Sequence, residues 1–545
     1  MGSDVKREEV KRLIQELMGE GGERMRNKAM EWKKKAHTAT GLNGSSSLNV
    51  DNLVKEISKD MDAWARDEKK PHVVFIPCPA QSHIKAMLKL AELLHHKGIE
   101  ITFVNTDTIH KRFLESGGPH CLDASPPGFR FETIPDGISF NSLDDVATAR
   151  KKRINSIRNL LSAPFLDLLT KLPTPPTCIV SDGVMSGFTI DVAQKLGIPI
   201  MLYWTFAACG FMIFYQMKFL IEKGLAPFKD ESYLINGYLD TIVDWIPGMD
   251  GICIKDFPSM VRTTDPNDQL LNFATECTRR SHEVPHHIFH TFDKLEPSIV
   301  KALSSMFSHV YTIGPLQLLL DRIPEEEKHT QVSHFNGYSL MKEEPECFQW
   351  LRSKEPNSVI YVNFGSTTVM SFEELNEFGW GFVESGYSFL WIIRSDLVVG
   401  ESATLPPEFE ECIEKGKGFV ASWCSQEKVL NHPSVGGFLT HCGWGSTIES
   451  LSAGVPMICW PYVADQMINC RYICKEWEVG LEMGSSVKRE EVKRLIQELM
   501  GEGGERMRNK AMEWKKKAHI ATGLNGSSSL SVDNLVKEIS KLSTN

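Results

Sequence analysis

Short apolar runs alternate with amphipathic segments along most of this chain. The runs predict buried strands, and the segment at 84–96, with an apolar residue every three or four positions, predicts a helix. In the first half, strands are predicted at 72–76, 99–104, 178–181 and 200–203. In the second half, they are predicted at 358–364, 389–394, 418–421, 436–440 and 455–460. Apolar strands that alternate with helices are typical of parallel sheets covered on both faces, so the pattern predicts two doubly wound α/β units.

The two ends of the chain carry near-identical copies of one helical segment. Residues 5–58 recur at 487–540 and differ only at Thr38 versus Ile520 and at Asn49 versus Ser531. Solenoid repeats diverge and stack in threes or more. We therefore interpret the repeat as a recent or engineered duplication, in which a copy of the C-terminal segment precedes the natural start. We expect the C-terminal copy to dock natively, because it keeps its native connection.

A polar, charged stretch between the two α/β units predicts a linker. The expected parts are the duplicated segment at 1–60, a first Rossmann-like domain at 61–313, the linker at 314–347, a second Rossmann-like domain at 348–483, and helices at 484–545 whose last member returns to the first domain.

Composition narrows the classes of function. The 545 residues are 42% hydrophobic and 24% charged with a net charge of −10, and no basic stripe supports nucleic-acid binding. The 13 cysteines have no metal-type spacing and predict reduced thiols in a cytoplasmic protein. The apolar stretch at 198–215 is interrupted by Pro199 and Gly210, so it predicts a buried strand and a pocket-lining helix, not a membrane span. We expect a monomer.

Residues 423–466 combine a Gly-rich turn with groups suited to a nucleotide sugar. An apolar strand ends at Thr440, a turn follows at 441–446, and a helix continues to Ala453. Backbone N–H groups of such a turn and the positive end of the helix dipole stabilise a phosphate. Groups suited to the base, the ribose and the sugar surround the turn: Trp423, Gln426, Glu449, Asp465 and Gln466.

This segment resembles the signature box of the plant family 1 UDP-glycosyltransferases from end to end. The resemblance implies an α/β fold of the GT-B type, with two Rossmann-like domains facing a cleft, the first binding the acceptor and the second the UDP-sugar. It implies UDP-glucose as donor co-substrate. No cluster of metal ligands stands out in the sequence, and we expect no metal and no other cofactor. In this family a closing Gln, here Gln466, goes with glucose, whereas His goes with galactose.

The same resemblance assigns a contact to each residue of the box. Uracil would stack on Trp423 and bind the Cys424 backbone, and the ribose would bind Gln426 and Glu449. The diphosphate would contact His441, Gly443, Gly445 and Ser446, and the sugar would contact Trp444, Asp465 and Gln466. Outside the box, Ser366 resembles a further diphosphate contact and Thr205 a contact to the sugar 6-hydroxyl.

Gly445 departs from the family pattern, which usually has Asn at this position. One side-chain contact near the phosphates is therefore missing, at a cost of about 1 kcal/mol if nothing replaces the hydrogen bond.

His83 and Asp182 each follow a predicted strand, at the edge where open α/β sheets bind ligands. A neutral imidazole can remove the proton of an acceptor hydroxyl, and a nearby carboxylate stabilises the imidazolium that forms. Their positions also resemble those of the family's catalytic His and its activating Asp. We therefore expect His83 to be the base, Asp182 to support it, and the anomeric carbon to be attacked with inversion.

The resemblance extends over nearly all of 61–545 and is closest to family members that glucosylate a diterpenoid hydroxyl. It implies a small apolar alcohol as acceptor, with the 13-hydroxyl of steviol as the first choice, and Phe206, Phe211, Met212 and Phe214 suit such a molecule. Another terpenoid or a phenol stays an alternative, as does an impaired variant that only binds UDP-sugar. A glycoside hydrolase needs two carboxylates flanking the bond, and no such pair stands out.

Overall fold

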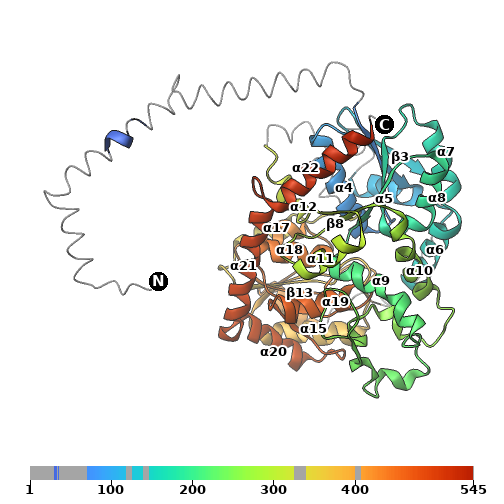
Figure 1. The fold of residues 1–545 in the computed structure, drawn as a ribbon. Coiled ribbons are helices and arrows are strands. Elements are labelled where there is room, and N and C mark those ends of the chain that lie inside the picture. Colours follow the sequence, from blue (N-terminus) through green and yellow to red (C-terminus); the bar gives the residue numbers. More distant parts are fainter. Residues whose placement is uncertain are drawn as a thin grey trace, which may run out of the picture. The chain divides into compact units, whose positions relative to one another are not determined.

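The computed structural model describes residues 30–33, 35, 70–117, 125–138, 146–324, 339–398 and 407–543. Most of the N-terminal copy of the repeat, and residues 325–338 of the predicted linker, lie outside these ranges. Two parallel sheets organise residues 70–543, which confirms the predicted pair of doubly wound α/β units (Figure 1).

The first sheet has seven parallel strands in the order β3-β2-β1-β4-β5-β8-β9. They are β1 (His72–Ile76), β2 (Glu100–Thr106), β3 (Phe129–Ile134), β4 (Cys178–Asp182), β5 (Ile200–Trp204), β8 (His286–Phe289) and β9 (His309–Thr312). The helices of this part are α4 (Gln81–His96), α5 (Asp107–Gly117), α6 (Val146–Asn159), α7 (Ser162–Lys171), α8 (Ser186–Leu196), α9 (Ala208–Glu222), α10 (Gln269–Arg279), α11 (Pro297–Met306) and α12 (Leu316–Leu320).

Alternate residues of β1 face opposite sides of this sheet, as the two-residue period of a strand requires. Val73 and Phe75 pack in a cluster with the apolar face of α4. Val74 and Ile76 pack in another cluster with residues of α7 and α8, such as Phe165. A strand buried on both faces explains why the sequence shows a continuous apolar run there.

The second sheet has six parallel strands in the order β12-β11-β10-β13-β14-β15. They are β10 (Val359–Asn363), β11 (Ser388–Ile392), β12 (Gly418–Ala421), β13 (Val435–Thr440), β14 (Met457–Cys459) and β15 (Gly480–Glu482). The helices are α14 (Glu346–Arg352), α15 (Phe372–Ser385), α16 (Pro407–Glu414), α17 (Gln426–Leu430), α18 (Trp444–Ala453) and α19 (Gln466–Arg471). Every strand predicted from the sequence lies within two residues of its observed ends.

Three helices end the chain: α20 (Arg489–Met500), α21 (Glu505–Ala521) and α22 (Ser527–Leu542). The first two pack on the second domain, α20 against α15 and α21 against α18. The third, red in Figure 1, crosses to the first sheet, where Val532, Leu535 and Ile539 join the core cluster of β1 and α4. At its start, Ser528 Oγ donates to the Gly314 carbonyl at 2.6 Å.

The apolar stretch at 198–215 divides into β5 and the start of α9, as predicted. Among the residues that the structure describes, none of the helices combines the length and the apolar character needed to cross a bilayer.

Candidate active site

A cavity of about 860 Å³ lies at the carboxyl ends of strands from both sheets. Residues that follow β1, β5 and β8 line it from the first domain, and residues that follow β10, β12 and β13 line it from the second. Every residue predicted to act in catalysis or to bind the donor lines this cavity except Asp182, which lies behind His83. The structure therefore brings together groups that are far apart in the sequence.

His83 and Asp182 form a hydrogen-bonded pair. Nδ1 of His83, in the first turn of α4, lies 2.7 Å from Oδ2 of Asp182, the last residue of β4. The backbone N–H of Cys78 donates to the same oxygen at 3.3 Å, and the N–H of Val184 donates to Oδ1 at 2.9 Å. Because a carboxylate only accepts, Nδ1 carries the proton, which leaves Nε2 as the basic nitrogen.

The pKa of His83 is set by opposing effects. Burial lowers it, but the charge of Asp182 and its hydrogen bond raise it, and the net result lies above the ordinary value. Asp465, across the cavity, raises the pKa of His83 further, whereas Arg153 lowers it. The imidazole is thus a stronger base than a free histidine.

Thr205 lies against the imidazole, because its Oγ1 is 3.0 Å from Nδ1 of His83. The sequence predicts this hydroxyl as a contact to the sugar 6-hydroxyl. The side chain lines the cavity beside the imidazole, and the contact with the sugar stays a prediction.

The Gly-rich turn brings His441 close to two glycines. A Cβ atom at either Gly365 or Gly443 would lie 2.4 Å from Nε2 of His441. Gly365 also has a φ of +71°, in the left-handed region that favours glycine. Gly443 caps α18, so the N–H groups of Trp444, Gly445 and Ser446 form its first turn and lack helical acceptors. These N–H groups line the cavity at a helix N-terminus, which is suited to a diphosphate.

His441 is a neutral hydrogen-bonding group. Burial, and then the positive charge of Arg394, lower its pKa to about 4. It can donate one hydrogen bond to a phosphate oxygen but adds no full positive charge near neutral pH. The charge on a diphosphate would therefore be stabilised by dipoles of the turn.

Gln426 is the centre of a polar network beside Glu449. Its Nε2 donates to Oε2 of Glu449 at 2.8 Å and to Oγ of Ser446 at 3.0 Å. Its Oε1 accepts from Nδ2 of Asn363 at 3.0 Å. The network fixes the orientation of the amide, and Asn363 is a participant that the sequence pattern does not reveal.

The three sugar contacts predicted within the box differ in which of their polar groups are left without a partner in the protein. The indole N–H of Trp444 donates to the His290 carbonyl at 2.7 Å, so it is not available to a sugar. Oε1 of Gln466 accepts from the N–H groups of Tyr462 and Val463, both at 2.8 Å, which leaves its NH₂ group. Oδ2 of Asp465 accepts from Asn469 at 2.8 Å, and burial raises the pKa of this carboxyl.

Two residues with side chains adopt left-handed backbone conformations in this region. Cys442 (φ 64°) precedes Gly443, and Ala464 (φ 60°) precedes Asp465. Such conformations cost about 1 kcal/mol or more in non-glycine residues and concentrate at functional sites.

The apolar part of the cavity agrees only in part with the sequence prediction. Phe206 and Phe214 line it, but Phe211 and Met212 are fully buried in the core, so their predicted place at the acceptor pocket is wrong. Because α9 is apolar almost all round, its sequence does not tell the core face from the cavity face. Apolar lining residues that the sequence prediction misses are Ile154, Ile157, Met260, Leu270 and Phe273.

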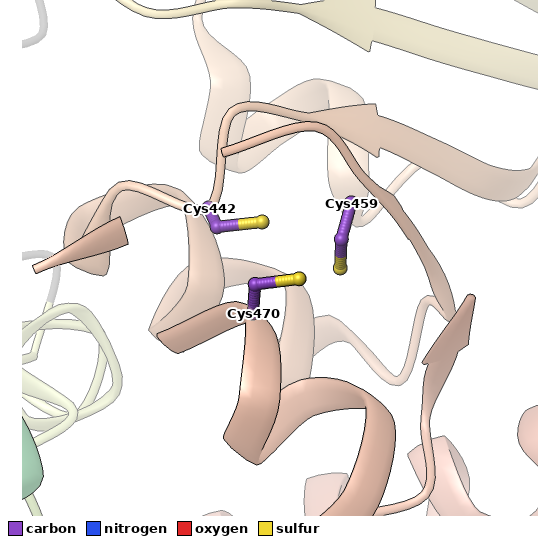
Figure 2. Close-up of side chains that lie close together, drawn as sticks. All are labelled: Cys442, Cys459 and Cys470. Atoms are coloured by element: carbon purple, nitrogen blue, oxygen red, sulfur yellow. The ribbon is translucent and has the colours of Figure 1, made fainter. Parts of the chain in front are cut away.

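Three thiols converge behind the turn, although their spacing in the sequence gives no metal-binding pattern. The Sγ atoms of Cys442, Cys459 and Cys470 all lie within 4.8 Å of one another (Figure 2). Soft cations bind thiolates, but burial raises the pKa of Cys442 and Cys459 well above the ordinary value. Hydrogen bonds from the neighbouring thiols lower the pKa of Cys470 instead, and all three side chains pack in the core.

The sequence of residues 331–513 matches the family model for UDP-glucoronosyl and UDP-glucosyl transferases. The chain is 70% identical over 485 residues to UDP-glycosyltransferase 85C2 of Stevia rebaudiana, a match that covers 89% of this chain and 100% of that protein. It is 52% identical over 481 residues to (R)-mandelonitrile beta-glucosyltransferase of Prunus dulcis, which covers 87% and 98%.

The fold is similar to that of Phytolacca americana UGT2, solved in complex with UDP-2fluoro-glucose and pterostilbene. The TM-score is 0.69 at 26% sequence identity, and the match covers 86% of this chain and 100% of that chain.

Proposed function

Because this chain belongs to the plant family of UDP-glycosyltransferases, we propose that it transfers glucose from UDP-glucose to the 13-hydroxyl of steviol, with inversion at the anomeric carbon. It is a glycosyltransferase with a GT-B fold and a UDP-sugar donor. The observation that carries the proposal is the His83–Asp182 pair beside the same cavity as the Gly-rich turn. A cytoplasmic location and a monomeric state stay predictions.

In the proposed reaction, Nε2 of His83 takes the proton of the acceptor hydroxyl, and Asp182 stabilises the imidazolium. The acceptor oxygen forms a bond to the anomeric carbon as the bond from that carbon to the UDP oxygen breaks. UDP leaves with its new charge at the first turn of α18, where the N–H groups stabilise it. Preorganised donors at the developing charge are a large part of catalysis in such sites.

The donor roles proposed for the box are those that the family resemblance implies, and the fact that all of these residues line one cavity supports them. Trp423 and Cys424 would bind uracil, Gln426 and Glu449 the ribose, and Asp465 and Gln466 the sugar. Ser366, His441, Gly443, Gly445 and Ser446 would surround the diphosphate.

Two arginines of α6 favour an acceptor that carries an acid group. Arg150 and Arg153 line the same cavity as Phe206, Phe214 and Phe273, and neither forms an ion pair with a described residue. Steviol combines a rigid hydrocarbon skeleton with one hydroxyl and one carboxylate at opposite ends, so it suits an apolar cavity with a cationic region. Other terpenoid or phenolic alcohols are the alternatives.

The test is incubation with UDP-glucose and steviol, with UDP release and product mass measured together. We expect one glucose to be added and UDP to form in equal amount. If UDP forms without a glucoside, the proposed acceptor is wrong. If neither UDP nor a glucoside forms, the proposed transfer reaction is wrong. An NMR coupling constant of the new anomeric proton reports inversion.

A further inference from the structure

Two lysines of α4 form ion pairs with glutamates of the second domain, directly across the cavity. Nζ of Lys85 lies 2.6 Å from Oε1 of Glu427 and 2.8 Å from Oε1 of Glu449. Nζ of Lys89 also bonds Oε1 of Glu427. All four side chains line the cavity, at the part where Glu449 is proposed to bind the ribose.

The group is largely removed from solvent. The side chains of Glu449, Lys89 and Lys85 are 6%, 5% and 24% exposed. Buried ion pairs add little net stability compared with apolar packing, but removal of one partner leaves an uncompensated charge. The positive charges of the two lysines balance the negative charges of the two glutamates. Because the group lies where Glu449 is proposed to bind the ribose, its position points to a role other than stability.

The charge of Lys85 opposes the effect of burial on the Glu449 carboxyl. Burial raises the pKa of Glu449, Lys85 lowers it, and the neighbouring Glu427 raises it again, so the net pKa lies above the ordinary value. Without Lys85, the amide of Gln426 and the charge of Lys89 would remain to oppose burial. A protonated carboxyl is a weaker acceptor for ribose hydroxyls than a carboxylate, because hydrogen bonds to charged groups are stronger.

Glu449 is also held from both domains at once. Its Oε1 accepts from Lys85 of the first domain, and its Oε2 accepts from Gln426 of the second at 2.8 Å. The orientation of the carboxylate therefore depends on a side chain that lies more than 360 positions away in the sequence.

We propose that Lys85 is a positioning residue for the donor: from the acceptor-binding domain, it holds the Glu449 carboxylate in the orientation that binds the ribose hydroxyls. This inference rests on the proposed function, because the ribose role of Glu449 belongs to it. It gives the first domain a part in donor binding.

The test compares Lys85→Met with Lys85→Arg in steady-state kinetics. We expect Lys85→Met to raise the KM for UDP-glucose about tenfold, with a much smaller change in kcat, and Lys85→Arg to restore most of the affinity. Lys97→Met is the matched control, because Lys97 follows α4 and pairs with Asp533 at 2.9 Å but is 40% exposed and lies outside the cavity lining.

A second readout separates positioning from a general structural defect. UDP and 2′,3′-dideoxy-UDP, which lacks both ribose hydroxyls, are compared as inhibitors. The wild type should bind UDP more tightly, and Lys85→Met should reduce this preference to that of Glu449→Gln. Equal loss of affinity for both nucleotides, or no loss, would overturn the inference. If Lys85→Met does not fold, Lys85→Gln is tested instead, by the same ratio of the affinities for UDP and 2′,3′-dideoxy-UDP.

The two proposals can fail separately. If Glu449→Gln leaves the preference for UDP unchanged, the ribose site itself is wrong. If Glu449→Gln removes the preference and Lys85→Met keeps it, only the role of Lys85 is wrong.

Discussion

Asp182 accepts a hydrogen bond from Nδ1 of His83 at 2.7 Å, while two backbone N–H groups hold the carboxylate from behind. The pair therefore has one orientation, with Nε2 of the imidazole free to take a proton. Asp182 is fully buried and makes no contact with the cavity, so its effect on a reaction passes through His83.

His83→Ala should abolish transfer, and Asp182→Asn should lower kcat by roughly 10²–10⁴-fold, because the base is removed in one case and loses its support in the other. UDP binding, measured by calorimetry, should stay within about twofold of the wild type in both variants, because neither residue belongs to the nucleotide-binding box. If a variant loses UDP binding together with glucose transfer, the defect lies in folding and the result does not support the assigned roles.

The pH profile should report the raised pKa of His83. The base works in its neutral form, so kcat/KM falls as the pH drops through this pKa, and the acid limb should lie above the range of an ordinary histidine. In Asp182→Asn the charge that raises the pKa is gone while burial remains, so the limb should move to lower pH. A limb that does not move between the two proteins would argue against His83 as the base.

Gly445→Asn should strengthen donor binding. A Cβ at Gly445 has no heavy atom within 4 Å, so a larger side chain fits without a clash. One new hydrogen bond near the diphosphate corresponds to about 1 kcal/mol, or about a fivefold lower KM for UDP-glucose. Gly445→Ala separates the effect of the new hydrogen bond from that of helix propensity. This variant should raise the free energy of unfolding and leave the KM for UDP-glucose unchanged. An equal effect of Ala and Asn on KM would contradict the amide contact.

Gly365→Ala should damage the donor site more than its backbone strain alone predicts. The new Cβ would meet the ring of His441, and φ is positive. Gly386→Ala is the matched control, because Gly386 has a φ of +83° but open space around it. Both should lose about 1 kcal/mol of unfolding free energy from strain, measured with denaturant, and only Gly365→Ala should also raise the KM for UDP-glucose several-fold. If Gly365→Ala and Gly386→Ala had the same KM for UDP-glucose, the proposed clash with His441 would be wrong.

The acceptor proposal predicts a preference for a free acid. Wild-type enzyme should use steviol with a higher kcat/KM than steviol methyl ester, and the double variant Arg150→Met, Arg153→Met should lose most of this preference, since a paired charge adds about 1–3 kcal/mol at a partly buried site. The KM for UDP-glucose is the internal control. If the variant keeps the preference, the arginines do not bind the carboxylate.

The parts of the site that follow from local sequence are the ones that the sequence predicts well. The strand before His441, the helix after Gly443 and the apolar run of β1 each depend on residues within a few positions of one another. The paired orientation of His83 and Asp182 is also expected, because the ends of neighbouring parallel strands β1 and β4 meet at one edge.

Side chains whose surroundings come from distant segments are not predictable in this way. Lys85 is two residues from His83, yet its partners lie on α17 and α18. Phe211 and Phe214 belong to one apolar helix, and only packing places the first in the core and the second at the cavity. The indole of Trp444 is likewise directed by a carbonyl that follows β8 of the other sheet.

The path of α22 limits how the two domains can move. The chain joins them once through the region after β9 and a second time where α22 packs on the first sheet after α20 and α21 have packed on the second domain. Both connections add to the direct contacts between the domains, such as the hydrogen bond from Trp444 to His290. Substitutions at Val532 or Leu535 should therefore weaken the attachment of α22 to the first sheet without changing a residue of the cavity lining.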